Sequence, residues 1–226
     1  MLADAGPTGD RGRLADKVAD RHLPRPHQVP RPEVGVTLHR RRPGGAPRGH
    51  RGAPIHMLSR YCIAIDNRQA TYPVDTPWLS DCLQRVLLDE GVDAVNLQVA
   101  LVDDAQIHRV NREFLHHDWP TDVISFDYTE HVTMRDVPPN QWPRGRGRWI
   151  DGELVISVET AVRQAHVHGW SPEQELLLYG VHGCLHLCGY DDLADAERPL
   201  MRRRERELLA LFGLCPSGLE DEPTVP

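Results

Sequence analysis

The chain has 226 residues and a formal net charge of −7, a length that can bury the core of one ordinary domain. We expect neither a membrane span nor a signal peptide, because the sequence contains no sufficiently long apolar run and no charged-then-apolar start. Its five cysteines lack paired metal-binding spacing, so we expect free thiols and a cytoplasmic protein rather than a disulfide framework.

Charge divides the chain into two parts. Residues 1–56 carry a net charge of +6 and are rich in proline, glycine and arginine, whereas the remainder carries −13. A segment with so little apolar periodicity cannot bury enough surface to offset its chain entropy, so we predict disorder there. This basic extension is a nucleic-acid-binding arm, a solvated tail, or the result of a start codon placed upstream of Met57. We expect a folded metal-dependent domain over 57–215 and a disordered tail over 216–226.

Hydrophobic periodicity predicts about four short strands in a mixed order with helices. Asp75 or Thr76 can cap the first helix, and Ser171 with Gln174 forms a capping box before a later one. Because the order lacks a strict βαβ rhythm, we predict an α+β fold, a single domain with one mixed sheet and helices packed over it. In chain order, we expect a strand over 60–67, a helix from 76 to 90, a strand over 95–102, a helix over 105–115, strands over 123–126 and 152–157, and helices over 158–168, 172–188 and 195–212.

Arginines are concentrated in two segments of the predicted domain. Arg144, Arg146 and Arg148 fall in an expected long loop over 127–149, beside tryptophans, a combination suited to phosphate contact and base stacking. A solvated loop is the alternative. The run of opposite charges over 202–207 in the last helix predicts a solvated face.

The most informative stretch is residues 180–192, G-V-H-G-C-L-H-L-C-G-Y-D-D. His182 and His186 stand four residues apart in an apolar helix, so both imidazoles leave the same face. Gly189 suits the end of this helix, and Asp192 can return a carboxylate to the open side of the two histidines. We predict an open, catalytic metal site with room for water. The alternative is a pair of buried core histidines.

The neighbours of these three residues have expected roles of their own. Cys184 and Cys188 interleave with the histidines but lie on another face of the helix, so we expect them to be small buried hydrophobes. Asp191 either orients a metal-bound histidine or caps the turn.

The residue after the first histidine separates this stretch from the metzincin proteases. Their motif, H-E-x-x-H-x-x-G-x-x-H, needs a glutamate as general base at the position that Gly183 occupies here. We therefore expect no proteolysis by that mechanism. We also expect the glycine to leave space beside the metal for a larger group, such as a phosphodiester.

The same stretch resembles the signature of the YbeY endoribonuclease family, H-G-x-L-H-L-x-G-Y-D-H. Residues 110–126, V-N-R-E-F-L-H-H-D-W-P-T-D-V-I-S-F, are similar to that family's L-N-x-x-Y-R-x-x-D-x-P-T-D-V-L-S-F-P, and residues 152–157, G-E-L-V-I-S, to its G-D-I-x-I-S. The resemblance covers residues 58–212. It implies a zinc-dependent endoribonuclease that cuts single-stranded ribosomal RNA, matures the end of small-subunit RNA and takes part in quality control of the small ribosomal subunit.

Two departures from the family pattern bear on the chemistry. Asp192 replaces the third histidine, and an anionic ligand lowers the net charge of a zinc site from +2 to +1, weakens activation of bound water and favours harder ions. Leu115 stands where the family has an arginine that contacts the substrate, and Arg112, on a neighbouring face of the same helix, is the predicted replacement. We therefore predict that His182, His186 and Asp192 bind the metal and that Arg112 completes the catalytic set.

Two other functions compete with this prediction. A metal-dependent hydrolase of another substrate would keep the site but not the RNA. A non-enzymatic ribosome-associated factor would use the metal only to hold its fold, and the missing arginine and the acidic body favour it. The sequence leaves the oligomeric state open.

Overall fold

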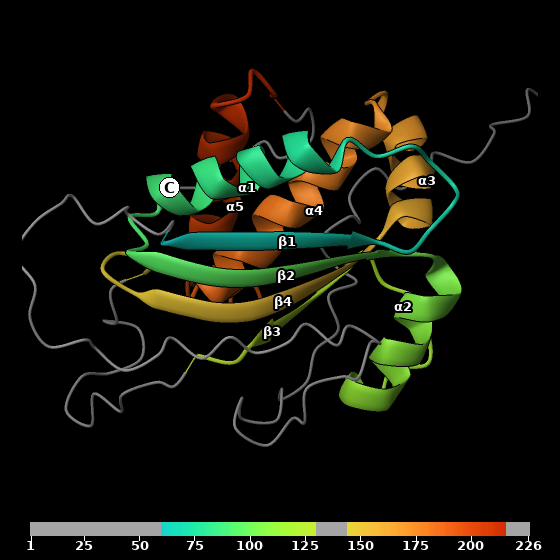
Figure 1. Ribbon diagram of the computed structural model, residues 1–226, viewed down its shortest axis with the longest axis horizontal. Helices are drawn as coiled ribbons and strands as arrows, with labels where there is room; N and C mark the ends of the chain where they lie inside the picture. The colour runs from blue at the N-terminus through green and yellow to red at the C-terminus, as the bar shows by residue number, and fades with distance from the viewer. Residues whose placement is uncertain (1–59, 130–143, 216–226) are drawn as a thin grey trace, which may run out of the picture.

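The computed structural model describes residues 60–129 and 144–215, which form a four-stranded mixed sheet covered by helices (Figure 1). The strand order is β1-β2-β4-β3, with β1, β2 and β4 parallel and β3 antiparallel to β4 at the edge. This architecture confirms the predicted α+β fold. The extension over 1–56 and the tail over 216–226 lie outside the described residues, as does Met57. The strands are β1 (Tyr61–Asn67), β2 (Ala94–Val102), β3 (Val123–Asp127) and β4 (Trp149–Ser157).

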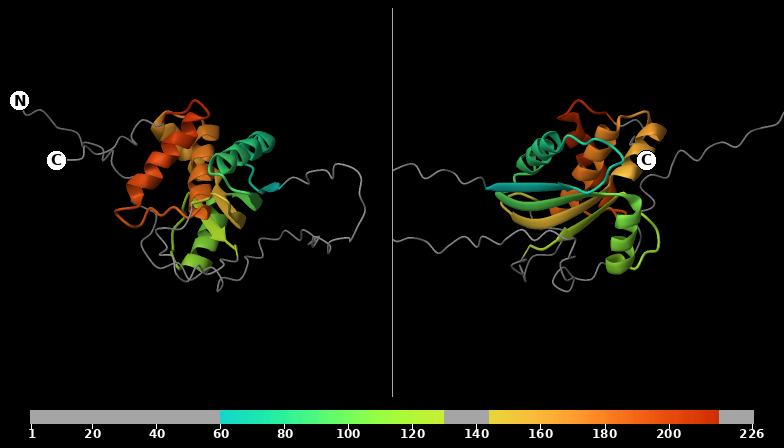
Figure 2. Two further views of the ribbon diagram at one scale, coloured as in Figure 1. Left: turned by 90° about the vertical axis from the view of Figure 1, so that its left-hand side faces the viewer. Right: turned by 45° about the vertical axis from the view of Figure 1, so that its right-hand side comes forward.

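Helices cover both faces of this sheet. In the described part of the chain, α1, α3 and α4 lie on one side with α5 packed outside α4, and α2 lies on the other side (Figures 1 and 2). None of the helices in 60–129 and 144–215 is both long and apolar enough to cross a membrane. The helices are α1 (Thr76–Asp89), α2 (Asp104–Val110), α3 (Val158–His168), α4 (Pro172–Leu187) and α5 (Arg198–Ala210), and a π-helical turn, η2 (Asn111–Leu115), continues α2.

Side-chain caps fix where the helices begin. Asp75 caps α1 and Asp103 caps α2, each by accepting a hydrogen bond from a backbone N–H three residues on. Ser171 and Gln174 form the predicted capping box at the start of α4. The last helix begins later than predicted, because residues 191–197 form turns that lead the chain back past the end of α4.

The strands alternate their side chains between two apolar clusters, one on each face of the sheet. On the α4 side, Leu97 and Leu154 are buried together with residues of α1 and α4. On the other side, Val155 and Phe126 are buried against Ile107 of α2. The sheet is therefore covered on both faces, and α4 lies over its larger core.

Two glycines of α4 face neighbouring elements at close range. A Cβ atom at Gly183 would lie 2.7 Å from Cδ2 of Leu154 and 3.1 Å from Oγ of Ser125, whereas one at Gly180 would lie 2.8 Å from Cδ2 of Leu83. Gly183 therefore lets α4 approach β4 and β3 closely, and its open side faces the sheet. The expectation that this glycine leaves space beside the metal is wrong, because the space is already filled by the sheet.

We expect Gly183→Ala to lower the free energy of unfolding by about 1–3 kcal/mol, and by more than Gly180→Ala. The added methyl at 183 meets residues of two strands, whereas at 180 it meets the end of one leucine side chain. Both glycines lie inside the same helix, so both variants gain similar helix propensity. Urea unfolding of the two variants beside the wild type measures the difference, and equal stabilities would contradict this account.

Candidate metal centre

The structure brings the three predicted ligands together at the end of α4. His182 and His186 lie one turn apart on this helix, and Asp192 returns from the turn that follows it. The two Nε2 atoms are 3.0 Å apart, and the carboxylate oxygens of Asp192 lie 3.7 Å from Nε2 of His186 and 3.9 Å from Nε2 of His182. Gly189, with φ of 91°, allows the chain to fold back at this point.

The three side chains fit a divalent metal ion. Ligand atoms around a tetrahedral zinc ion, with bonds of about 2.0–2.2 Å, lie roughly 3.3–3.6 Å from one another, close to the separations observed here. The Oδ1 atom of Asp192 is buried and has no hydrogen-bond partner in the described part of the chain. A buried carboxylate oxygen is unfavourable without a partner, and a bound cation would satisfy it. Two imidazoles and one carboxylate also leave coordination positions for water or substrate.

Glu205 of α5 holds His182 from the side opposite the other ligands. Its buried carboxylate lies 2.5 Å from Nδ1 of His182. When Nδ1 donates to this carboxylate, Nε2 is left free to bind a metal. The prediction of a solvated face is wrong for Glu205, because Met201 and Leu208, which share its side of α5, are buried. In the sequence, Met201 and Leu208 lie four residues before and three residues after Glu205, and this helical spacing of apolar residues indicates that Glu205 is on the buried face of α5.

Backbone atoms orient the second histidine. Nδ1 of His186 lies 3.2 Å from the carbonyl oxygen of Tyr190, and donation to that oxygen leaves Nε2 free for a metal. Asp191 accepts a hydrogen bond from the backbone N–H of Leu193 at 2.9 Å. Of the two roles predicted for Asp191, capping the turn and orienting a metal-bound histidine, the structure therefore shows the first.

Burial and neighbouring charges give the two histidines opposite protonation preferences. Burial opposes a charge on His182, but the hydrogen bond and charge of Glu205, helped by Asp122 and Asp192, raise its pKa to about 9. Burial and the charge of His182 lower the pKa of His186 to about 4. At neutral pH without metal, His182 is therefore a charged imidazolium with both nitrogens protonated, whereas His186 is neutral. A metal ion has to displace the proton on Nε2 of His182, so its affinity rises with pH.

The predicted cation, Arg112, makes no contact with these three side chains among the described residues. It is exposed on η2, which continues α2 on the opposite side of the sheet from α4 (Figure 1). Leu115, in the same turn, packs on the apolar cluster around Phe126. The residue at the position of the family arginine, Leu115, therefore packs in the core here. The role of Arg112 as a substrate-contacting cation stays a prediction.

Two of the three arginines before β4 are in ion pairs. Arg144 pairs with Glu197 and lies over the ring of Tyr190, with its guanidinium carbon 4.6 Å from the ring centroid. Arg148 lies 3.7 Å from Asp127. These contacts tie the segment to the rest of the domain, so neither arginine is simply solvated. Trp142, which we expected beside them, lies outside the described residues.

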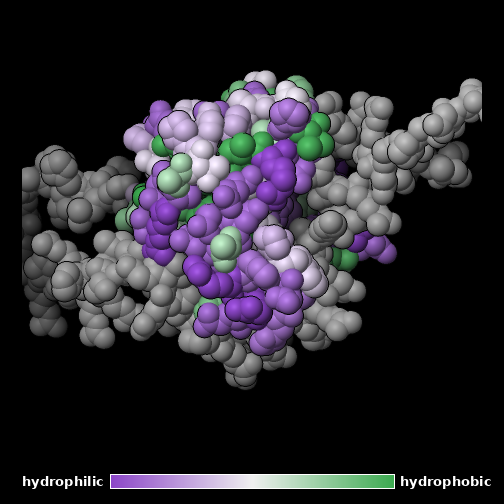
Figure 3. Space-filling view, turned by 90° about the vertical axis from the view of Figure 1, so that its right-hand side faces the viewer, coloured by the Kyte–Doolittle hydropathy of each residue, from purple (hydrophilic) through white to green (hydrophobic). Residues whose placement is uncertain are grey.

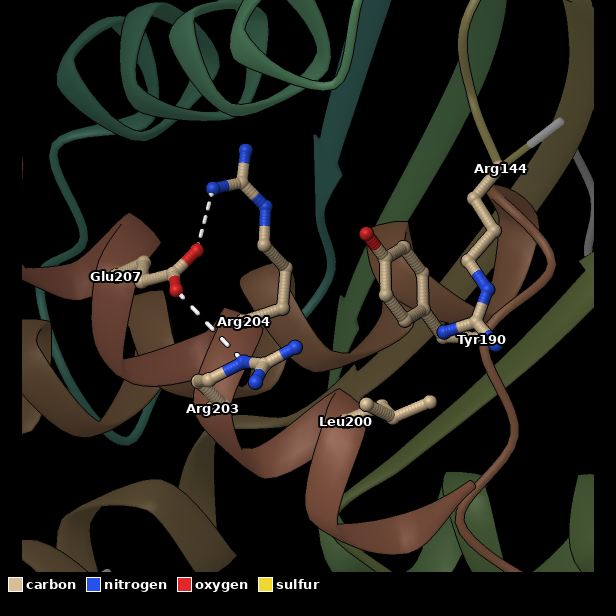
Figure 4. Close-up of a pocket in the computed structure, with 6 residues that line it drawn as sticks. All are labelled: Arg144, Tyr190, Leu200, Arg203, Arg204 and Glu207. Carbon is tan, nitrogen blue, oxygen red and sulfur yellow. Dashed lines mark hydrogen bonds and ion pairs between the residues drawn. The ribbon is translucent and has the colours of Figure 1, made fainter. Parts of the chain in front are cut away.

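A pocket of about 530 Å³ lies between Tyr190 and α5 (Figure 4). Arg204 is bound there by three carboxylates, those of Asp89, Glu90 and Glu207. Because its cations are largely neutralised, this pocket does not by itself attract an anion. Its lining residues are Arg144, Tyr190, Leu200, Arg203, Arg204 and Glu207.

A mixed α+β domain in which two histidines and an aspartate converge is the kind of scaffold that could hold a metal ion with open coordination positions. The model of the family described as endoribonuclease YbeY matches residues 64–213, and the chain belongs to this family. The recognition made from the sequence is therefore confirmed, and so, at the level of the family, is the endoribonuclease function.

Individual relatives named endoribonuclease YbeY are similar over most of the domain. The one from Rhodopirellula baltica is 42% identical over 139 residues, which are 61% of this chain and 64% of that relative. The one from Pelotomaculum thermopropionicum is 37% identical over 156 residues, 67% of this chain and 97% of the relative. The chain therefore spans just under two thirds of the first and nearly all of the second. A solution structure of a Thermotoga maritima protein is similar with a TM-score of 0.44 and 22% identity, covering 73% of this chain and 99% of that one.

We expect Glu205→Ala to weaken zinc binding roughly 10- to 100-fold, because His182 loses the acceptor that fixes its tautomer and ring orientation. Glu207→Ala is the matched control, since its carboxylate lies two residues away on the same helix and pairs only with arginines in the described structure. Competition with a chromophoric chelator measures both affinities. Equal zinc affinity of the two variants would show that Glu205 does not orient the ligand.

Proposed function

We propose that this protein is a zinc-dependent endoribonuclease that cleaves single-stranded RNA at the centre formed by His182, His186 and Asp192. The observation that carries the proposal is the convergence of these three side chains, together with the buried Oδ1 atom of Asp192, which has no hydrogen-bond partner in the described part of the chain. Membership of a family whose relatives are named endoribonucleases supports RNA as the substrate. The motif match further favours small-subunit ribosomal RNA, and with it the small ribosomal subunit as partner.

The metal, when bound, supplies a Lewis acid that polarises a phosphate oxygen and lowers the pKa of an attacking water or ribose hydroxyl. The protein supplies orientation. Glu205 and the carbonyl of Tyr190 hold the outer nitrogens of His182 and His186, so both ligands are fixed before substrate arrives. Asp192 adds a negative charge that favours retention of the cation but moderates its acidity.

A reducing compartment suits this protein. All five cysteines lie among the described residues, and none forms a disulfide. Cys184 and Cys188 are buried beside the centre, and burial raises the pKa of the Cys184 thiol to about 12, so it stays protonated. We place the reaction in the cytoplasm, where such thiols persist.

One observation favours the second candidate, a ribosome-associated factor with a structural metal. Leu115 fills the place of the substrate-contacting arginine and is packed on the apolar cluster, while Arg112 lies exposed in the same turn. The protease alternative gains nothing from the structure, because the side chain of a residue at position 183 would face the sheet.

The test is cleavage of a labelled single-stranded RNA by the zinc-loaded full chain. We expect His186→Ala to reduce the rate by roughly 100-fold or more through loss of a metal ligand, and a chelator to do the same. His166→Ala, an exposed histidine on α3, is the control and should cut like the wild type.

If the wild type binds one zinc ion per chain and loses thermal stability when the metal is removed, yet leaves the RNA intact, the site is structural. Co-sedimentation with small ribosomal subunits would then support the second candidate. Cleavage of casein in place of RNA would identify a hydrolase of another substrate.

We expect Arg112→Ala to weaken RNA binding and to reduce the dependence of affinity on salt by about one phosphate contact. Arg109→Ala is the matched control, because Arg109 is also exposed and lies three residues earlier on the same helical segment. Fluorescence anisotropy at several salt concentrations measures both. If the two variants bind and cleave RNA alike, Arg112 does not contact the substrate.

A further inference from the structure

Two aromatic rings stack at the surface between η2 and β3. The rings of His117 and Trp119 have centroids 4.8 Å apart and an interplanar angle of 11°. Trp119 is 46% exposed, although tryptophan is among the residues that gain most from burial. A flat ring that is backed on one side and open to solvent is the form that proteins use to stack nucleic-acid bases. We call His117 and Trp119 the aromatic platform.

The backbone holds the aromatic platform in place. Asn111 is buried, and its side-chain Nδ2 donates to the carbonyl oxygen of Trp119 at 2.7 Å. The carbonyl of Asn111 accepts in turn from the backbone N–H of His117 at 3.3 Å. Pro120 restricts the next backbone position. Because one buried residue ties down both ring-bearing positions, little conformational freedom remains to be lost when a ligand binds.

A short stretch of chain joins the aromatic platform to the metal centre. Ser125 of β3 is six residues beyond Trp119, and six residues of extended chain span at most about 22 Å, which bounds the separation of these two residues. Ser125, in the strand that follows, lies 3.4 Å from the carbonyl oxygen of Gly183, next to the first ligand.

The surroundings favour a nucleic acid over a protein partner. The surface that is visible at this end of the sheet is mainly hydrophilic, with only small hydrophobic groups (Figure 3). Arg112, exposed in η2, supplies a cation close in sequence. The sequence after residue 56 is acidic, so a contact that does not depend on phosphate charge is of particular value to RNA binding. Base stacking is such a contact, and it tolerates any sequence.

We propose that Trp119, backed by His117, stacks on an unpaired base of the RNA that is cleaved at the metal centre. This inference rests on the proposed function and names the substrate contact of that site. Bases inside a double helix are stacked on one another and cannot reach the ring, so the aromatic platform would select single strands. It also provides binding energy in a chain where Leu115 has replaced the substrate-contacting arginine.

The test compares Trp119→Ala with Leu88→Ala in the zinc-loaded full chain. Leu88 is 51% exposed and lies on α1, so Leu88→Ala removes an exposed apolar side chain far along the chain from the aromatic platform. We expect Trp119→Ala to weaken RNA binding roughly 5- to 150-fold and to raise KM accordingly, with kcat little changed. Trp119→Phe should restore most of the affinity, and Leu88→Ala should behave like the wild type.

A series of RNAs, each lacking one base, locates the contact. For the wild type, removal of one base near the cleavage site should weaken binding about as much as Trp119→Ala does. The Trp119→Ala variant should bind that abasic RNA no more weakly than it binds the intact RNA. Equal affinities of the Trp119→Ala and Leu88→Ala variants would refute base stacking on the aromatic platform, while the proposed nuclease activity would still stand. A wild type that binds RNA through Trp119 but never cuts it would refute the proposed function and still support the aromatic platform. Absence of RNA binding by the wild type would refute both.

Discussion

The close contact of α4 with the sheet at Gly183 is the constraint on which the metal centre depends. Because no side chain separates the helix from Leu154 and Ser125, α4 lies low over β4 and the edge strand β3. This position sets the height of His182 above β3, which begins directly after Asp122. A larger residue would lift the ligands away from the segment that precedes β3, and the relation between metal and substrate would change with it.

The protonation states of the two histidines at the centre follow from the burial of carboxylates beside their imidazoles. Asp192 and Glu205 are both largely buried, and each lies against a histidine nitrogen. Without a cation these carboxylates retain a proton on His182 as partial compensation, which accounts for its raised pKa. Binding of a metal ion would therefore be coupled to the stability of this part of the fold, because the ion would replace the proton as the positive charge among the carboxylates.

Local signals in the sequence predicted the parts of the site that depend on spacing. Two histidines one turn apart and a glycine at the helix end are sufficient to bring Asp192 back to His182 and His186, and the caps fixed where α4 begins. The sequence could not predict that Gly183 faces the sheet, since this depends on which side of α4 packs against the strands. Glu205 was missed because its charged neighbours on α5 suggested solvent, whereas packing against α4 determined its burial.

The orientation of Gly183 also limits how this scaffold could acquire new chemistry. A metzincin protease carries its general base on the residue after the first histidine, and here a glutamate at that position would have to occupy the volume of Leu154 and Ser125. A single substitution would therefore displace the helix before it provided a base. In evolution or in the laboratory, peptide hydrolysis could be reached from this fold only by rebuilding the contact between helix and sheet, even though two of the metal ligands already match.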